Sequence, residues 1–263
     1  MRKFLIGGLA AIASVALVTG AVAQSPDVQI TGKVKPTKGG TKKTPKNGQS
    51  TLFLRNNVPN TTAGTIEVDL PKNYVLNTTA FKKNYCSVSK INAQGADACK
   101  KALGGPVGFS QAVVDPAGTK TPLLFRVTTY VGAKNKLTFF LQQIQPQGSD
   151  NLSNNLNALK DNPLDPNGVV TAISGTISNK GGKFGKKLVI KIPPDLQQPA
   201  PGVFSALTSL QNTFGTAKKN SLVQFDGCPS NGKHVFGVKL TFAPNPGAPP
   251  KPSATGEQTV KCS

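Results

Sequence analysis

The sequence has no tryptophan, one histidine and only three tyrosines among its 263 residues. A single histidine cannot complete most zinc sites, and the four cysteines lack the paired C-x-x-C spacing of zinc knuckles. Carbohydrate-binding sandwiches rely on exposed aromatic rings, so the scarcity of Trp and Tyr disfavours that class. We therefore expect no metal and no cofactor, and a core built from Val, Leu, Ile and Phe.

Acidic residues are also scarce, with 11 Asp and Glu against 31 Lys and Arg, which gives a formal charge of +20. Beyond the first residues, Arg55 and Arg126 are the only arginines. Arginine reads phosphates and base edges through two parallel hydrogen bonds, whereas lysine acts as a point charge. This balance indicates diffuse attraction to a polyanion without specific nucleic-acid recognition, or else a surface charged for solubility alone.

No long apolar run follows the N-terminal segment. Met1-Arg2-Lys3 is positive, Phe4 to Val18 is apolar or small, and Ala21-Val22-Ala23 matches a signal-peptidase site. We expect residues 1–23 to be a cleaved signal peptide, although a membrane anchor is the alternative reading. Removing 23 of the 263 residues leaves 240, and losing Arg2 and Lys3 lowers the formal charge from +20 to +18. The expected location is extracellular or cell-envelope, with no transmembrane segment after cleavage.

The four cysteines should be paired in an exported protein. Three connectivities are possible. The sequence-local choice joins Cys86 to Cys99 and Cys228 to Cys262.

Three consecutive runs, Val107–Val114, Leu123–Val131 and Lys136–Ile144, predict an antiparallel meander. Apolar side chains alternate with polar ones in the middle run, which is the period of a strand with one buried face. Asp115–Gly118 and Gly132–Asn135 provide the turns between the runs.

Further short apolar runs, separated by Gly- and Pro-rich turns, extend this pattern along the chain. They are Val28–Val34, Thr51–Leu54, Gly64–Leu70, Val169–Ser178, Lys187–Ile192, Val203–Phe214, Ser221–Phe225, Lys233–Phe242 and Thr255–Cys262. The segment Asp97–Leu103 predicts one helical turn. About ten or more short strands with little helix indicate an all-β antiparallel sandwich. We expect one domain over 24–263; if there are two lobes, their boundary lies near 146–168.

Lysine and glycine concentrate at two expected hairpin tips. The first tip lies between Val34 and Thr51, where a disordered arm is the alternative, and the second between Ser178 and Lys187. The candidate anion-binding residues are Lys38, Lys42, Lys43, Lys46, Lys180, Lys183, Lys186 and Lys187. These two tips could lie along one edge of the molecule.

Candidate catalytic groups are few. Gly108-Phe109-Ser110-Gln111-Ala112 approaches the G-x-S-x-G motif, and Asp150, Asp161 or Asp165 followed by His234 gives the hydrolase order. Ser110 nevertheless falls inside a strand, whereas a nucleophile needs a tight strand-to-helix turn. We expect His234 to be a surface residue at a strand start, and Glu67 and Asp69 to share a solvated strand face.

Several motifs together resemble a family of uncharacterised exported proteins of actinobacteria. They are the run Val34–Lys46, Cys86 and Cys99 ahead of Gly105-Pro106-Val107-Gly108, the stretch Leu188–Pro193, and Cys228-Pro229 followed by Phe236, Phe242 and Cys262. The chain departs from the family pattern where Lys100 follows Cys99 and where no Trp follows Cys228-Pro229. The resemblance implies export and β-structure, and it brings no catalytic residues.

The leading hypothesis is an exported, non-enzymatic basic protein that associates with an anionic cell-wall polymer or membrane surface. A secreted hydrolase and a carbohydrate-binding sandwich are the alternatives.

Overall fold

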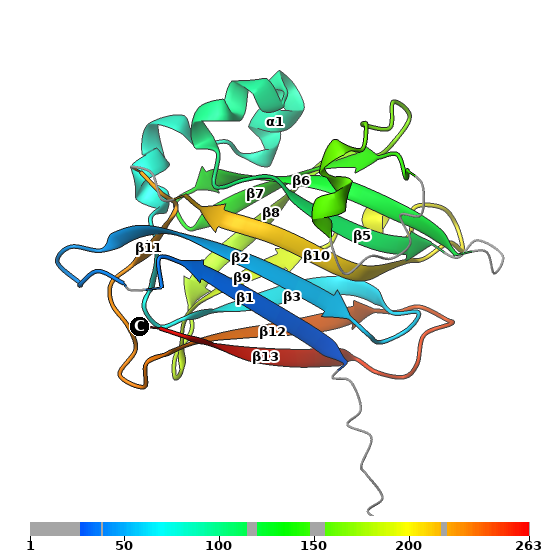
Figure 1. The fold of residues 1–263 in the computed structure, drawn as a ribbon. Helices are drawn as coiled ribbons and strands as arrows, with labels where there is room; N and C mark the ends of the chain where they lie inside the picture. Colours follow the sequence, from blue (N-terminus) through cyan, green and yellow to red (C-terminus); the bar gives the residue numbers. More distant parts are fainter. Residues whose placement is uncertain (1–26, 38, 115–119, 148–155, 217–219, 263) are drawn as a thin grey trace, which may run out of the picture.

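The computed structural model describes residues 27–37, 39–114, 120–147, 156–216 and 220–262 (Figure 1). The expected signal peptide and the turn at Asp115–Gly118 lie outside these ranges. Within them, no helix is long and apolar enough to cross a membrane.

Thirteen strands form the framework of the molecule. They are β1 (Val28–Lys35), β2 (Lys46–Asn56), β3 (Thr62–Pro71), β4 (Tyr74–Leu76), β5 (Gly108–Val114), β6 (Thr121–Ala133), β7 (Lys136–Ile144), β8 (Val170–Asn179), β9 (Phe184–Lys191), β10 (Ser205–Gly215), β11 (Val223–Phe225), β12 (Lys233–Ala243) and β13 (Ser253–Lys261). The helices are short: η1 (Thr78–Asn84), α1 (Val88–Gln94), η2 (Ala96–Ala102), η4 (Leu156–Asp161) and α2 (Pro194–Gln197), where η denotes a 3₁₀ helix.

The strands are joined in the order β13-β12-β3-β9-β8-β7-β6-β5-β10-β2-β11-β4, with β1 paired to β2. All the pairings are antiparallel. The sheet folds back so that β1, β2, β10 and β5 lie over β3, β9, β12 and β13, as Figure 1 shows. This arrangement confirms the expected all-β antiparallel sandwich and its central meander β5-β6-β7.

Alternation in the sequence explains which side chains enter the core. In β12, Phe236, Val238 and Leu240 are buried, whereas Lys239 between them is exposed. The same alternation in β2 buries Leu52 and Leu54, which join the core from the facing layer. Period-two patterning therefore places one face of each strand in a shared interior.

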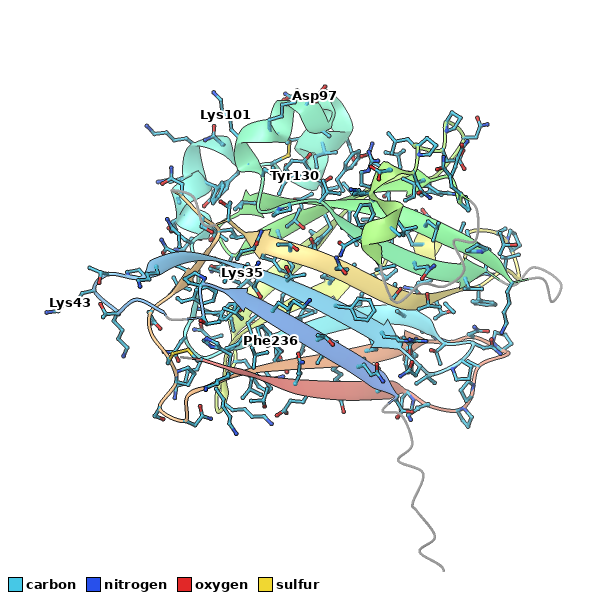
Figure 2. The ribbon with its side chains drawn as sticks, viewed as in Figure 1. Lys35, Lys43, Asp97, Lys101, Tyr130 and Phe236 are labelled. Atoms are coloured by element: carbon cyan, nitrogen blue, oxygen red, sulfur yellow. A yellow bond between two sulfur atoms is a disulfide. The ribbon has the colours of Figure 1, made fainter. Side chains whose placement is uncertain are left out.

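The meander departs from the expectation of one buried face. Tyr130 and Phe140 on its outer face are buried against Cys86, Ile91 and other residues of the helical segment 78–102. Figure 2 shows Tyr130 beneath that segment. Farther along the meander, η4 packs against its outer face through Leu156 and Leu159. Both faces of β5–β7 are thus covered because two helical insertions fold over them.

Two disulfides join Cys86 to Cys99 and Cys228 to Cys262, with Cα–Cα distances of 5.5 and 5.7 Å. The sequence-local pairing is therefore confirmed. The first disulfide fastens the helical segment 78–102, and the helical turn expected at Asp97–Leu103 is present as η2. The second ties the loop before β12 to the end of β13.

Candidate functional site

One end of the sandwich gathers several lysine-bearing loops. In β11, Phe225 pairs with both Lys46 of β2 and Tyr74 of β4, and Pro71 at the end of β3 pairs with Phe184 at the start of β9. These pairings place the β1–β2 loop, the β3–β4 turn and the β8–β9 turn at the same end. We call this region, together with η1, the β6–β7 turn and the adjoining ends of β12 and β13, the basic end.

The described lysines of the basic end are Lys35, Lys42, Lys43, Lys46, Lys72, Lys82, Lys83, Lys134, Lys180, Lys183, Lys186, Lys187, Lys233 and Lys261. Figure 2 shows Lys43 projecting outward from the β1–β2 loop. The loop begins and ends in paired strands, which confirms the hairpin and rules out a disordered arm over its described residues.

The lysines of the first tip are exposed to solvent. Lys42, Lys43 and Lys46 are exposed and have no carboxylate partner within the described ranges. Lys38 lies outside those ranges. The free ammonium groups of this tip are therefore available to an anionic ligand.

The lysines of the second tip have partners within the protein. Lys180 contacts both Glu67 and Asp69 at 2.7 Å, and Lys187 contacts Glu67 at 3.2 Å. Lys183 pairs with Glu257 on β13, while Lys186 donates a hydrogen bond to Asn179 at 2.5 Å. These internal partners neutralise much of the positive charge of the second tip.

The prediction of a solvated carboxylate face on β3 was wrong. Asp69 is only 6% exposed and Glu67 is half-buried, because the β8–β9 turn folds Lys180 over them. The hydrogen bond from Lys180 has the largest effect on Glu67 and lowers the pKa of that carboxyl, with burial acting against it. Burial opposes protonation of Lys180, but hydrogen bonds to Asp69 and Glu67 outweigh it and raise the lysine pKa.

The opposite end of the sandwich has nearly balanced charges. Its described ionic residues are Arg55, Lys120, Lys160, Lys191 and Lys251 against Asp27, Asp161, Asp165 and Asp195. Two pairs among them are ion-paired, Lys160 with Asp161 and Lys251 with Asp27. The positive charge is thus distributed asymmetrically, a property that the total of +20 does not reveal.

The structure does not assemble the candidate hydrolase triad. Ser110 lies in the interior of β5, paired with Phe125 and Leu210. His234 packs instead against Tyr74 and Phe225, and neither of its ring nitrogens has a hydrogen-bond partner within the described ranges. Asp161 and Asp165 belong to the balanced end, and Asp150 lies outside the described residues.

His234 is a buried residue, which corrects the expectation of a surface position. It lies near the start of β12, as predicted, but is only 1% exposed. Its ring lies 5.8 Å from Tyr74 and 6.0 Å from Phe225, measured between centroids. Burial lowers the pKa of His234 because the charged imidazolium would lose its hydration.

An apolar cavity of about 130 Å³ lies between the two layers. Its walls come from both layers; they include Leu52, Leu54, Ile66, Val68, Phe125, Val127, Phe139, Leu188, Ile190 and Phe214. Toward α2 the lining becomes exposed, through Val169, Asp195 and Pro199. α2 connects the end of β9 to the start of β10, and both of these strand ends lie opposite the basic end. The mouth of the cavity therefore lies opposite the basic end as well.

The sequence contains no separate signal for this cavity. Its lining residues follow the same period-two pattern as fully packed core residues, and only their spatial arrangement leaves a space between them. The ion pairs of Glu67 and Asp69 with lysines were weakly indicated by the sequence. Glu67 and Asp69 lie two residues apart on one face of β3, and Lys187 lies on the partner strand.

Comparison of the chain with family models, with curated proteins and with solved structures found no match. Among the described residues, no group of three or more His, Cys, Asp or Glu side chains could hold a metal ion. The fold and its two disulfides define the class of the protein as an all-β antiparallel sandwich.

Proposed function

We propose that this protein is an exported, non-enzymatic binding protein that attaches to an anionic polymer of the cell envelope through its basic end. The carrying observation is the exposed β1–β2 tip, where Lys42, Lys43 and Lys46 have no carboxylate partner among the described residues. Other lysines at the same end, including Lys82 and Lys83, extend the positive surface beyond the tip.

A repeating polyanion suits this surface better than a compact ligand. The ammonium groups lie on several loops and form no enclosed pocket, so each contributes a solvated contact to a different charge along the polymer. Lysines also lack the planar fork that would select one phosphate geometry. The interaction should therefore tolerate variation in the polymer and weaken steeply with salt.

The test measures binding of the mature protein to inorganic polyphosphate as the anionic polymer. The variant Lys42→Gln/Lys43→Gln/Lys46→Gln should lose about tenfold or more in affinity at low salt, since each surface lysine near a polyanion contributes about 1 kcal/mol. The matched control is Lys120→Gln/Lys160→Gln/Lys251→Gln, which removes the same formal charge from the opposite end.

Equal losses in the two variants would contradict a localised site and leave only an effect of total charge. Binding that persists in molar salt would contradict the electrostatic account. Washing intact cells with increasing salt extends the test to the envelope, where the wild-type protein should be released progressively.

A further inference from the structure

The apolar cavity is long compared with its volume. Its lining runs from Leu188 on β9 to Ile192, the residue after that strand, which spans roughly 13 Å at the rise of a β-strand. Its volume of about 130 Å³ approaches the ~150 Å³ of an engineered apolar cavity that stays dry and binds benzene. An extended aliphatic chain fits this shape better than a bulky ring system.

The walls offer almost no groups for a polar or peptide ligand. The backbones of β5, β6, β9 and β10 are engaged in strand ladders. Asn212 is also engaged, since it donates to Thr129 Oγ1 at 2.7 Å and accepts from the Thr213 amide at 2.8 Å. A peptide would bury unpaired amides here, which is costly, so the ligand must be mostly hydrocarbon.

Ser110 is the exception in the wall. It lines the cavity and is 6% exposed. A hydroxyl that lines an otherwise apolar cavity can hydrogen-bond a ligand that carries one oxygen at this depth.

The mouth indicates the charge of that ligand. Among the described residues that line the cavity, Asp195 is the only one with an ionic side chain. Lys191 precedes Ile192 on β9 and lines a hollow on the outer face of the sheet with Ser174 and Thr176, so its ammonium does not serve the mouth. A fatty-acid carboxylate would meet a like charge at the mouth, and beside Ser110 it would be buried with no cation among the described lining residues; both positions disfavour a free fatty acid.

We propose that the cavity binds a single aliphatic chain carrying an uncharged oxygen, in the class of long-chain alcohols and acyl esters. The chain lies between the two layers, its oxygen accepts a hydrogen bond from Ser110, and the rest of the molecule leaves past α2. This site is separate from the basic end and does not depend on polymer binding there.

The test titrates 1-alkanols of four to twelve carbons into the purified mature protein and measures their binding by isothermal titration calorimetry. Affinity should rise about threefold to fourfold per methylene group while the chain fills the cavity. It should then level off once added carbons extend beyond the mouth. At pH 7, 1-octanol should bind at least tenfold more tightly than octanoate.

Three variants separate the parts of the proposal. Ala112→Leu fills the cavity and should lower 1-octanol affinity more than tenfold, with an unchanged circular dichroism spectrum. Ser110→Ala keeps the volume and should weaken 1-octanol about threefold to tenfold through loss of one hydrogen bond. Asp195→Asn should narrow the preference for 1-octanol over octanoate. The control Lys42→Gln should change neither the affinity for 1-octanol nor this preference.

A lack of saturable 1:1 binding, or affinity that Ala112→Leu leaves unchanged, would overturn the proposal. If Ala112→Leu does not fold, the Ser110 and Asp195 variants still decide it. Octanoate binding as tightly as 1-octanol would overturn the assignment of an uncharged oxygen.

Discussion

At the residue scale, Asp69 and His234 show opposite ways of burying an ionisable group. Asp69 is buried with an ammonium beside it, since Lys180 lies 2.7 Å from its carboxylate. His234 is buried among aromatic rings with no hydrogen-bond partner for either nitrogen in the described ranges. The first arrangement keeps a charge inside the protein, whereas the second keeps the side chain neutral.

Replacing Lys180 with Met should destabilise the protein by about 1–3 kcal/mol, because the Asp69 carboxylate would remain buried without its cation. The matched control is Lys183→Met. Lys183 pairs with Glu257 in a setting where the two side chains are 56% and 45% exposed, so its loss should cost less than about 1 kcal/mol. Urea unfolding at pH 7 measures both values, and equal costs would contradict the distinction.

The buried histidine predicts a stability change between neutral and mildly acidic pH. Its pKa is lowered in the folded state, so the unfolded chain binds a proton first as the pH falls below about 6.5. The contribution of the neutral histidine to the free energy of unfolding should therefore be present at pH 7 and be lost progressively as the pH falls toward 5. Tyr74, the titratable group packed against the ring, stays neutral in this window because burial raises its pKa.

Urea unfolding at pH 7 and pH 5 tests the role of His234. His234→Leu should reduce the difference in unfolding free energy between the two pH values. Glu67 has a lowered pKa, so its contribution is present above its usual pKa near 4.5 and is lost at more acidic pH. A decline from pH 7 to pH 5 that is unchanged in His234→Leu would exclude this histidine as its source.

At the element scale, the strands were largely predictable, whereas the insertions were predicted only for the helical turn at Asp97–Leu103, which is η2. Lys233–Phe242 alternates cleanly and forms β12, and even Val28–Val34, which alternates only weakly, forms β1 with nearly the expected bounds. The segment 78–102 has no comparable period, since its short helices are stabilised by one disulfide and by packing on Tyr130 and Phe140. Only tertiary contact explains why the second face of the meander is also buried.

The two disulfides should make different contributions to stability. In the chain-entropy model, Cys228–Cys262 closes 34 residues and contributes about 4 kcal/mol, and Cys86–Cys99 closes 13 and contributes about 3 kcal/mol. The paired serine variants, unfolded in guanidinium chloride, measure these losses. Loss of Cys86–Cys99 should also expose Tyr130 to solvent, whereas loss of Cys228–Cys262 should not.

A tyrosine-specific near-ultraviolet spectrum checks this difference in the folded variants. Burial is the main cause of the raised pKa of Tyr130, and Asp97 adds to it. The tyrosine should therefore titrate closer to its ordinary value when the helical segment loosens. An unchanged titration would show that packing alone holds the segment in place.

At the scale of the whole molecule, charge and apolar access lie at opposite ends. The sign and size of the net charge follow from the sequence, but its concentration at one end does not, because loops far apart in the chain meet only through the strand ladders. It also could not indicate the cavity, whose lining residues have the same pattern as residues in filled regions. Ser110 was noticed only for a motif that the fold does not complete.

The concentration of positive charge at one end predicts different elution from a cation-exchange column for two variants of equal net charge. On a cation-exchange column, Lys42→Gln/Lys43→Gln/Lys46→Gln should elute at clearly lower salt than Lys120→Gln/Lys160→Gln/Lys251→Gln. The reason is that a protein with one positive end binds the resin through that end. Identical elution would mean that the surface acts as a uniform charge.

The neighbours of β1 also bear on the order of folding. β1 lies beside β13, where the side chain of Gln258 accepts a hydrogen bond from the Gly32 amide and Gly256 approaches Val28. β1, the first of the described strands, is therefore covered by β13, the last of them, more than 200 positions away. Until β13 is in place, the outer edge of β1 lacks this cover, so the sandwich closes only when β13 has been added.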